Sequence, residues 1–333
     1  MNNFWKNKKI FITGIDGFVG SNLAKELIIQ KAKVFGLIKR KKNSLIYFEN
    51  LDKKMNLYKG DITNKKLLKK ILKENKIEIC FHLAAQVEVG KANKEPFSTF
   101  ETNIRGTYSL LDSINHNKNY VKSIIIASSD KVYGTYPKKY LPYKEDYKLK
   151  ANFPYEVSKA CCDMISKSYA GELFKLPIII TRFTNIFGPG QLNFSALIPD
   201  IIRTIILNKN FIPRGDGTAV RDFIFVKDIV SIYLLLSKKL YMNKNYAGEI
   251  FNAGTNKPIT VKKIIEKILT QNKKHEQLTK ILALMKSAKT TGEIPHQFMD
   301  CKKISRYFKW KPHYTFERGI KETINWYKKY ITK

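Results

Sequence analysis

Three glycines at intervals of three residues follow a short apolar run near the start of the chain. Gly14, Gly17 and Gly20 separate that run, residues 10–12, from residues 21–30, in which apolar side chains recur at helical spacing. A strand, a glycine turn and a helix in this order bring backbone N–H groups and the positive end of the helix dipole to one point, where a phosphate can bind. The order favours a dinucleotide-binding loop over an ordinary strand-to-helix turn.

Apolar runs alternate with helical segments as far as residue 182. We expect strands at residues 34–38, 55–58, 79–83, 121–127 and 177–182, and helices at residues 64–74, 96–117 and 152–174. This alternation predicts an α/β fold with a Rossmann-type, doubly wound parallel sheet. Right-handed crossovers place the carboxyl ends of its strands at one edge, where ligands bind.

The alternation of strands and helices ends at a Gly-Pro-Gly turn at residues 188–190. Helices are expected at residues 196–208, 228–238, 260–270 and 316–330, and one more strand at residues 250–253. We therefore predict two domains. Residues 1–188 and about 222–255 form the dinucleotide-binding domain, and residues 189–221 and about 256–333 form a smaller C-terminal α/β lobe that binds the substrate.

The chain is strongly basic, with 61 Lys and Arg against 28 Asp and Glu and a formal net charge of +33. Such an excess is typical of nucleic-acid-binding proteins. Only 8 of the basic residues are arginines, however, and the lysines are scattered without aromatic interleaving or a basic tail. We therefore predict no nucleic-acid partner and expect the positive field to attract an anionic small substrate.

Cysteine usage and hydropathy indicate a cytoplasmic protein that has no metal site and does not enter a membrane. The four cysteines, Cys80, Cys161, Cys162 and Cys301, lack metal-ligand spacing and are expected to be reduced thiols. No apolar run is long enough to span a membrane, and residues 1–9 lack the apolar core of a signal peptide.

A tyrosine and a lysine four residues apart begin one of the predicted helices. This spacing places Tyr155 and Lys159 on one helix face. A free tyrosine titrates near pH 10, and a neighbouring ammonium stabilises its phenolate. Tyr155 is therefore a candidate base for a substrate hydroxyl whose carbon gives up a hydride. An incidental pair on a surface helix is the alternative in a chain so rich in lysine.

Together these motifs resemble those of the extended short-chain dehydrogenase/reductase superfamily, which contains nucleotide-sugar epimerases and dehydratases. The resemblance covers essentially the whole chain. It is carried by residues 13–20 (TGIDGFVG), 60–63 (GDIT), 82–86 (HLAAQ), 102–107 (TNIRGT), 128–134 (SSDKVYG), 155–159 (YEVSK), 182–188 (RFTNIFG), 197–199 (LIP) and 221–228 (RDFIFVKD).

The subgroup depends on Ser129, Asp130 and Lys131. Epimerases of the superfamily usually have small or polar residues after the serine, whereas the 4,6-dehydratases have a Ser or Thr followed by an acid and a base. The lysine in the third position, like the opening FWKNKK at residues 4–9, resembles the CDP-glucose 4,6-dehydratases. A GDP-hexose such as GDP-N-acetylglucosamine or GDP-mannose is a competing substrate, and a 4-epimerase is a competing activity. A polar loop at a strand end is the structural alternative for Asp130 and Lys131.

The resemblance implies a lyase with a tightly bound nicotinamide cofactor. Tyr155, supported by Lys159, would act as base, and Ser129 would hold the hydroxyl while hydride leaves sugar C4. Lys131 would then remove the C5 proton and Asp130 would protonate the departing C6 hydroxyl, before hydride returns to C6. The product would be a 4-keto-6-deoxy sugar for surface glycans. These roles require a protonated Asp130 and a neutral Lys131, or one proton shared by the pair.

The cofactor site implied by the resemblance follows the glycine loop and the neighbouring strand ends. An NAD-binding site has an acidic residue after the second strand, which binds the ribose hydroxyls. This chain has Lys39 and Arg40 at that position, and their positive charges suit the 2′-phosphate of NADP. Because arginine is rare in this chain, NADP is favoured, with NAD as the close alternative. Asp61 and Ile62 are expected at the adenine and two alanines at the nicotinamide half. The full set is Gly14, Gly17, Phe18, Val19, Gly20, Lys39, Arg40, Asp61, Ile62, Leu83, Ala84, Ala85, Tyr155 and Lys159.

For the nucleotide-sugar substrate, the resemblance places Asn185 and residues 197–199 near the sugar and the base. Arg221 would neutralise the diphosphate, for which a guanidinium fork is suited, and a structural ion pair is its alternative. The expected substrate set is Gln86, Asn185, Leu197, Ile198, Pro199 and Arg221.

An alternative of another class is a non-catalytic dinucleotide-sensing or nucleic-acid-binding protein. Damage to Tyr155, Lys159 or the glycine loop would favour it, and all of these residues are intact. The helices near residues 96–117 and 155–174 are the pair that forms the dimer interface in this superfamily, so the resemblance also predicts a homodimer.

Overall fold

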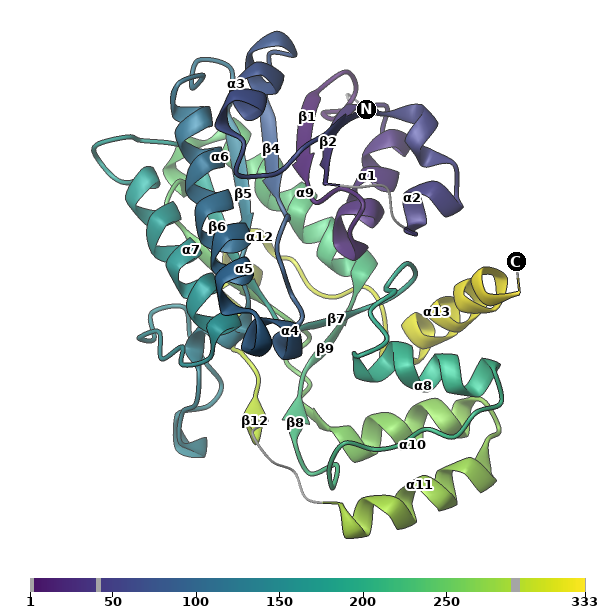
Figure 1. Cartoon of the computed structure of the whole chain (residues 1–333). Coiled ribbons are helices and arrows are strands. Elements are labelled where there is room, and N and C mark those ends of the chain that lie inside the picture. The colour runs from purple at the N-terminus through teal and green to yellow at the C-terminus, as the bar shows by residue number, and fades with distance from the viewer. Residues whose placement is uncertain (1–2, 40–42, 289–293, 333) are drawn as a thin grey trace. The chain divides into compact units, whose positions relative to one another are not determined.

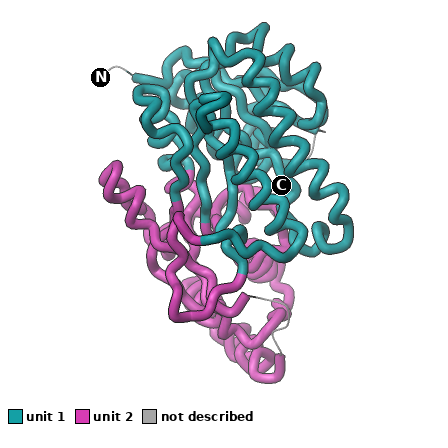
Figure 2. Tube along the Cα trace, turned by 90° about the vertical axis from the view of Figure 1, so that its left-hand side faces the viewer, with its two compact units in different colours: residues 1–134, 148–183, 230–251 teal, residues 135–147, 184–229, 252–333 magenta. Residues whose placement is uncertain are grey.

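The computed structural model of the chain describes residues 3–39, 43–288 and 294–332. It divides into two compact units, each assembled from segments that are distant in the sequence (Figure 2). Unit 1 comprises Met1–Gly134, Lys148–Phe183 and Val230–Phe251, and unit 2 comprises Thr135–Tyr147, Thr184–Ile229 and Asn252–Lys333. Compared with the predicted domains, residues 135–147, 184–188, 222–229 and 252–255 fall in unit 2.

Unit 1 is built on a seven-stranded sheet in the order β10-β6-β5-β4-β1-β2-β3 (Figure 1). Every recorded register between neighbours from β6 to β3 is parallel. This order confirms the predicted doubly wound Rossmann-type α/β fold. The strands are β1 (Lys9–Thr13), β2 (Lys33–Ile38), β3 (Asn56–Lys59), β4 (Ile79–His82), β5 (Ser123–Ala127), β6 (Ile178–Phe183) and β10 (Ile250–Ala253).

Helices cover both faces of this sheet, which is why its central strands are apolar at consecutive positions. On one face lie α3 (Lys65–Glu74), α6 (Gly106–Asn115) and α7 (Pro154–Ala170). Leu68 and Leu110 from two of these helices share a core cluster with Ile124 of β5. On the other face lie α1 (Phe18–Ile29) and α9 (Val226–Met242). Tyr233 of α9 packs there against the rings of Phe81 and Phe183.

Two of the predicted helices differ in detail from the structure. The first begins at Phe18 rather than at residue 21, so Gly20 lies inside it. The helix predicted over residues 96–117 is α5 (Pro96–Phe100), a π-helical segment (Glu101–Arg105) and then α6. The shorter elements of unit 1 are α2 (Leu45–Phe48), α4 (Val89–Lys94) and 3-10 turns at Leu51–Lys54, Asp130–Tyr133 and Lys244–Tyr246.

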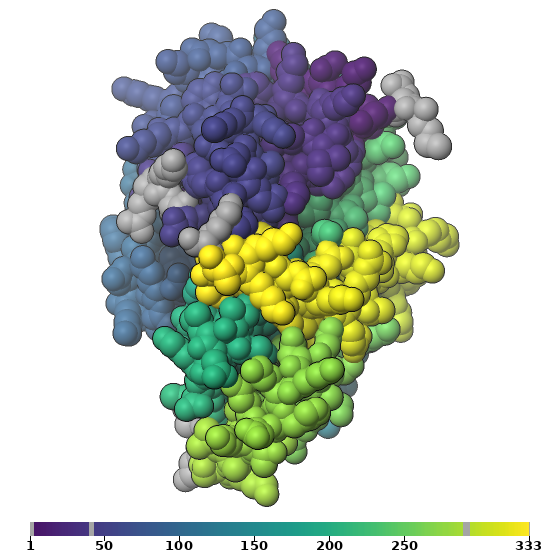
Figure 3. Space-filling model, turned by 90° about the vertical axis from the view of Figure 1, so that its right-hand side faces the viewer, coloured from purple at the N-terminus to yellow at the C-terminus, as the bar shows by residue number. Residues whose placement is uncertain are grey.

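Unit 2 combines two small sheets with five helices in its described part. The sheets are β7 (Asn185–Phe187) with β9 (Phe223–Phe225), and β11 (Ile259–Thr260), β8 (Val220–Arg221) and β12 (His296–Gln297) in that order. In Figure 3 the yellow side chains of α13 lie against the green ones of α8. The helices are α8 (Leu197–Ile206), α10 (Val261–Gln271), α11 (His275–Ser287), α12 (Lys302–Phe308) and α13 (Phe316–Ile331), and Lys138–Tyr140 is a 3-10 turn.

Among the residues placed in the structure, no helix has both the length and the apolar character that crossing a membrane requires.

Candidate active site

The glycine loop lies between β1 and the start of α1, at the carboxyl edge of the sheet. Gly14 has a φ of +68°, and a Cβ there would lie 2.8 Å from the backbone nitrogen of Ala84. A Cβ on Gly20 would collide with the carbonyl oxygen of Gly14, so both positions require glycine. Gly17 caps α1 without a side-chain hydrogen bond, and the first turn has no acid. Its N–H groups therefore face no carboxylate of their own helix, which fits a bound pyrophosphate.

The end of β4 is fastened to the end of β1 beside this loop. The hydroxyl of Thr13 accepts hydrogen bonds from the backbone N–H groups of Leu83 and Ala84, each at 3.2 Å. Leu83, Ala84 and Ala85 are half-buried. Their backbone is thus fixed next to the glycine turn, where the nicotinamide half of the cofactor is predicted.

An ion pair occupies the position expected for recognition of a 2′-phosphate. Lys39, just after β2, contacts the carboxylate of Asp61 at 2.7 Å. Burial opposes ionisation of Asp61, but hydrogen bonds from Lys39 and Thr63 outweigh it and lower the pKa of Asp61 to about 2. Lys39 therefore already has an anionic partner, and Arg40 lies outside the described residues. Ile62 is buried beneath α6, where a Cβ on Gly106 would lie 2.7 Å from its Cγ2.

Tyr155 and Ser129 lie side by side, Tyr155 on α7 and Ser129 just after β5. Tyr155, in the first turn of α7, is 8% exposed, and its hydroxyl shares a side-chain hydrogen bond with Ser129. Burial raises the pKa of Tyr155, the hydrogen bond with Ser129 lowers it in part, and the nearby carboxylate of Asp130 raises it further. The serine and the phenol thus form a pair that could bind one substrate hydroxyl between them.

Lys159 lies one turn after Tyr155 and is buried. Its ammonium donates a hydrogen bond of 2.8 Å to the carbonyl oxygen of Ala127, the last residue of β5. Burial lowers the pKa of Lys159, while Cys162 and Asp163 oppose this shift. The ammonium therefore anchors α7 to the end of β5, and its positive charge lies on the helix that carries Tyr155.

Asp130 and Lys131 lie in a 3-10 turn (Asp130–Tyr133) that Ser129 caps directly after β5. The hydroxyl of Ser129 accepts a hydrogen bond from the Lys131 backbone at 3.2 Å and donates one to the Asp130 carboxylate at 3.2 Å. Asp130 is 5% exposed, and Lys131 is half-buried. The acid therefore lies within the protein and not in a solvated loop, with the base next to it in the chain.

The buried Arg182 connects this 3-10 turn to helix α7. Arg182 of β6 donates a hydrogen bond of 2.8 Å to the hydroxyl of Tyr133 and pairs with Asp163 of α7 at 2.7 Å. The sequence identified Arg182 only as part of a motif and assigned no role to Tyr133 or Asp163. These partners are 49 and 19 residues away from Arg182. No periodic pattern links such positions.

The π-helical segment places Asn103 between the β4 loop and α7. The Asn103 amide accepts from the Gln86 N–H at 2.7 Å, and donates to the Gln86 carbonyl at 3.0 Å and to Ser158 at 2.8 Å. Ser158 in turn donates to the carbonyl oxygen of Tyr155. A π-bulge often marks a functional site, but no residue pattern predicts it. The Gln86 side chain bonds the backbone of Glu88 in its own turn and donates to the hydroxyl of Thr99 in α5.

His82 connects the glycine loop to the helices through buried hydroxyls. Its ring nitrogens lie 2.8 Å from the hydroxyl of Thr13 and 3.0 Å from that of Thr107. Burial, followed by the charge of Lys159, lowers the pKa of His82 from 6.5 to about 3. The imidazole is therefore neutral at physiological pH and serves both neighbours as a hydrogen-bonding partner.

This shift predicts a specific loss of stability in acid. The unfolded chain binds a proton at His82 near pH 6.5 and the folded chain does not, so stability falls as the pH falls through that value. We expect the free energy of unfolding of the wild type to decrease by about 2 kcal/mol more between pH 7 and pH 5 than that of His82→Gln. Urea unfolding at both pH values measures this difference. His116→Gln, at an exposed position, should behave as the wild type, and equal losses in wild type and His82→Gln would contradict the assignment.

The substrate residues expected in unit 2 have different environments. Asn185 of β7 donates a hydrogen bond of 3.3 Å to the carbonyl oxygen of Asp222. Arg221 of β8 is 9% exposed and donates to the carbonyl oxygens of Val220 and Pro295. Leu197 lines a pocket, whereas Ile198 and Pro199 are buried in the packed face of α8.

Comparison with known proteins finds 4,6-dehydratases among the relatives of this chain. Residues 11–323 match the family described as GDP-mannose 4,6 dehydratase. A dTDP-D-glucose 4,6-dehydratase of Dictyostelium discoideum is 33% identical over 285 residues, which cover 79% of this chain and 62% of that relative, less than two thirds of its length. A CDP-glucose 4,6-dehydratase of Salmonella typhimurium is 27% identical, with 99% of this chain and 93% of the relative covered.

Solved structures of two activities share the fold. A dTDP-glucose 4,6-dehydratase from Bacillus anthracis in complex with NAD is 28% identical, with a TM-score of 0.81 and 97% of each chain covered. A UDP-glucose 4-epimerase from Thermotoga maritima with UDP-glucose is 26% identical, with a TM-score of 0.83 and 97% of this chain and 99% of that chain covered. Because the architecture serves both activities, the residues at the site must decide between them.

Proposed function

Because the chain belongs to the GDP-mannose 4,6 dehydratase family, within the extended short-chain dehydrogenase/reductase superfamily, we propose that it is a nucleotide-sugar 4,6-dehydratase. It would convert a nucleoside-diphosphate hexose to the 4-keto-6-deoxy sugar with loss of water. The observation that carries this proposal is the buried Asp130 beside Lys131, on the turn that Ser129 caps next to Tyr155. A 4-epimerase needs no such acid and base, and the likeness to the UDP-glucose 4-epimerase keeps that activity as the second candidate.

Each residue of the site has a separate role in the proposed dehydration. A nicotinamide held beside the glycine loop and Leu83 to Ala85 would supply the hydride acceptor for sugar C4 and the hydride donor for C6. Tyr155 removes the proton of the C4 hydroxyl, which Ser129 holds by a hydrogen bond. The C4 ketone acidifies the C5 proton, and Lys131 removes that proton. Asp130 protonates the departing C6 hydroxyl, so that a water molecule leaves and a C5–C6 double bond forms. When hydride adds at C6, Lys131 returns its proton to C5, which gives the 4-keto-6-deoxy sugar.

For the cofactor we propose NAD in place of the NADP that Lys39 and Arg40 favour on sequence alone. Lys39 is paired with Asp61 at 2.7 Å, so a 2′-phosphate would compete with this carboxylate for the lysine. The dTDP-glucose 4,6-dehydratase from Bacillus anthracis also holds NAD. The dinucleotide released when the purified protein is denatured identifies which of the two it carries.

The reaction is tested with the purified holoenzyme and a panel of nucleotide hexoses, CDP-glucose, GDP-mannose, GDP-N-acetylglucosamine, dTDP-glucose and UDP-glucose. We expect one of them to lose a water molecule, detected by mass spectrometry of the product. CDP-glucose is the substrate that the sequence favours, with a GDP-hexose as its competitor. A product of unchanged mass with an inverted C4 would establish the epimerase instead.

We further propose a homodimer that forms through the helices near residues 96–117 and 155–174. Phe97 of α5 and Met164 of α7 support this, because their large apolar side chains are 77% and 67% exposed. At micromolar concentration the wild type should sediment as a dimer, and Phe97→Asp or Met164→Asp should sediment as a monomer. Ile29→Asp, at a position on α1 that is 63% exposed, should remain dimeric. A wild-type protein that is only monomeric would contradict this interface.

A further inference from the structure

A buried ion pair in unit 1 has no role in the mechanism proposed above. Arg182 of β6 and Asp163 of α7 are 3% and 2% exposed, and the guanidinium Nε lies 2.7 Å from the carboxylate. Taking two charges out of water is costly, and apolar side chains of similar volume often stabilise a fold as well or better. Stability alone therefore does not account for this pair.

Arg182 connects two elements through two different nitrogens. Its Nε binds Asp163 on α7, and its Nη1 donates a hydrogen bond of 2.8 Å to the hydroxyl of Tyr133. Tyr133 is fully buried, and the centre of its ring lies 4.8 Å from the guanidinium carbon. Because a guanidinium is planar and holds its N–H groups in a fixed fork, one rigid group sets the distance between Tyr133 and α7.

Each end of this bridge belongs to a different half of the proposed chemistry. Tyr133 is the last residue of the 3-10 turn Asp130–Tyr133, which carries the acid and the base of water elimination. Asp163 lies one helical turn after Lys159 on α7, and Tyr155 lies in the first turn of the same helix. The bridge therefore joins the residues that eliminate water to the residues that oxidise C4.

A second contact between the turn and α7 is the hydrogen bond between Ser129 and Tyr155. The substrate hydroxyl is proposed to bind between these two side chains, so this bond is not available to hold the turn during the reaction. The bridge through Arg182 does not involve the substrate and can stay intact throughout.

Backbone contacts fix the point at which the chain leaves the turn. The N–H of Lys150 donates a hydrogen bond of 3.2 Å to the carbonyl oxygen of Val132. Gly134 has a φ of +63°, and a Cβ there would collide with the carbonyl oxygen of Lys150. These contacts involve the loop before α7 and not the helix itself, so they do not replace the bridge.

We propose that Arg182 is a positioning residue for water elimination, which holds the turn of Asp130 and Lys131 in register with α7. The C4 hydroxyl binds at Tyr155, whereas the proton transfers of elimination take place at the next two carbons of the sugar. A misplacement of the turn by about 1 Å can lower the rate of these transfers about 10²-fold. This inference rests on the proposed function and predicts that Arg182 affects elimination far more than C4 oxidation.

The test is Tyr133→Phe in the full-length holoenzyme, with the nucleotide hexose found active in the panel. The variant keeps the ring beside Arg182 and removes only the hydroxyl. We expect kcat for water loss to fall about tenfold or more, and KM to change by less than about twofold. The rate of C4 oxidation, followed by the fluorescence of the reduced dinucleotide after rapid mixing, should also change by less than about twofold.

Hydrogen–deuterium exchange gives a readout that does not depend on turnover. In Tyr133→Phe the backbone amides of residues 130–134 should exchange about tenfold faster than in the wild type, and those of α7 should not. Unchanged exchange at residues 130–134 would show that the bond from Arg182 does not hold the turn.

Tyr241→Phe is the matched control. Its hydroxyl also contacts an ion pair, Lys8 with Glu78, at 2.9 Å to each partner. Lys8 and Glu78 precede β1 and β4, so this pair lies at the opposite edge of the parallel sheet from the turn. Tyr241→Phe should therefore leave both rates and the exchange of residues 130–134 unchanged.

Arg182→Lys provides a second variant. It keeps a positive charge for Asp163 but replaces the fork with a single ammonium group. It should lower water loss as Tyr133→Phe does. Adding Tyr133→Phe to Arg182→Lys should reduce the rate little further, because both substitutions break the same bridge.

The outcomes separate this inference from the proposed function. Undiminished water loss in both Tyr133→Phe and Arg182→Lys would overturn it, and so would an equal fall of C4 oxidation and water loss in Tyr133→Phe. A wild-type protein that removes water from none of the hexoses would contradict the proposed function and, with it, the role of Arg182 in elimination. Faster amide exchange in Tyr133→Phe would then still show that Arg182 holds the turn.

Discussion

Replacing Tyr155 with phenylalanine is expected to lower kcat by about 10²- to 10⁴-fold, the range typical of losing a general base. The ring stays packed in the first turn of α7, and only the hydroxyl that bonds Ser129 is removed. Steady-state turnover of the nucleotide hexose found active in the panel measures the effect. Tyr58→Phe makes the same chemical change at β3, where the hydroxyl contacts Asn75, and should keep wild-type turnover. Full activity of Tyr155→Phe would remove Tyr155 from the mechanism.

Tyr155 also determines whether kcat rises or falls with pH. Burial raises the pKa of Tyr155, so its base form is scarce at neutral pH and becomes more abundant as the pH rises. We therefore expect kcat of the wild type to rise with pH between about pH 6 and pH 9, by up to tenfold per pH unit. A rate that is flat or falls over this range would show that another group, or another step, limits the reaction.

The second large effect is expected at Asp130, the residue that separates water loss from simple oxidation. Asp130→Asn keeps the shape of the side chain and the oxygen that accepts from Ser129, but it cannot deliver a proton to the C6 hydroxyl. Water elimination should fall by about 10²- to 10⁴-fold. The C5 proton should still exchange with solvent deuterium, because Lys131 is unchanged, and mass spectrometry of the recovered substrate measures that exchange.

Lys131→Met provides the complementary variant. It should lose both water elimination and deuterium exchange at C5, whereas Lys138→Met, at an exposed lysine, should lose neither. If Asp130→Asn abolishes exchange as completely as Lys131→Met, the two residues share one proton and act as a single group. Undiminished elimination in Asp130→Asn would exclude Asp130 as the acid.

Much of unit 1 could be predicted because its signals are local and repeated. The strands of the sheet are apolar at consecutive positions because helices cover both faces. The glycine loop indicates where the first strand ends and the first crossover helix begins. The apolar spacing predicts a helix from residue 21, three residues after the observed start of α1, because Gly17 caps the helix without a side-chain signal. The π-helical segment was missed, since nothing in residues 96–117 interrupts the helical spacing, and Asn103 takes its partners from β4 and α7.

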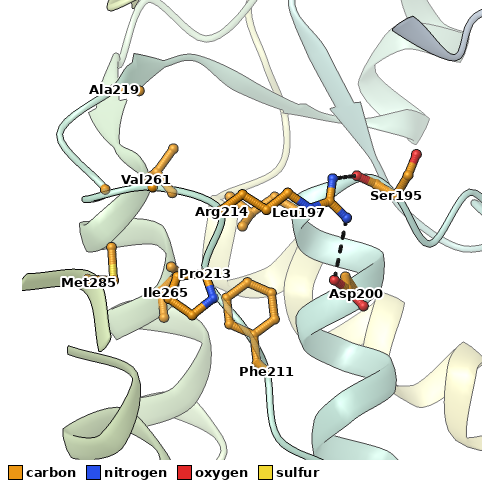
Figure 4. Close-up of a pocket in the computed structure, with 12 residues that line it drawn as sticks. Ser195, Leu197, Asp200, Phe211, Pro213, Arg214, Ala219, Val261, Ile265 and Met285 are labelled. Carbon is orange, nitrogen blue, oxygen red and sulfur yellow. Dashed lines mark hydrogen bonds and ion pairs between the residues drawn. The ribbon is translucent and has the colours of Figure 1, made fainter. Parts of the chain in front are cut away.

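The rest of the candidate site depends on partners that are distant in sequence. The sequence predicts that Lys39 lies at the end of β2. It does not predict the ion pair of Lys39 with Asp61, which follows β3, and this ion pair weakens the argument for NADP. In unit 2, β8, β11 and β12 have two residues each, too few for an alternating pattern to be recognised. The pocket that Leu197 lines (Figure 4) is formed by α8, residues 211–219, α10 and α11, which are far apart in the sequence, so no local pattern indicates it.

The interleaving of the two units limits how the chain can be divided. The polypeptide passes from one unit to the other after residues 134, 147, 183, 229 and 251. No single cut therefore yields either unit as an intact fragment, and an expressed piece that ends at residue 183 lacks residues 230–251 of unit 1. During synthesis, unit 2 is complete only when its last segment, residues 252–333, has been made, and a chain truncated before residue 251 lacks part of both units.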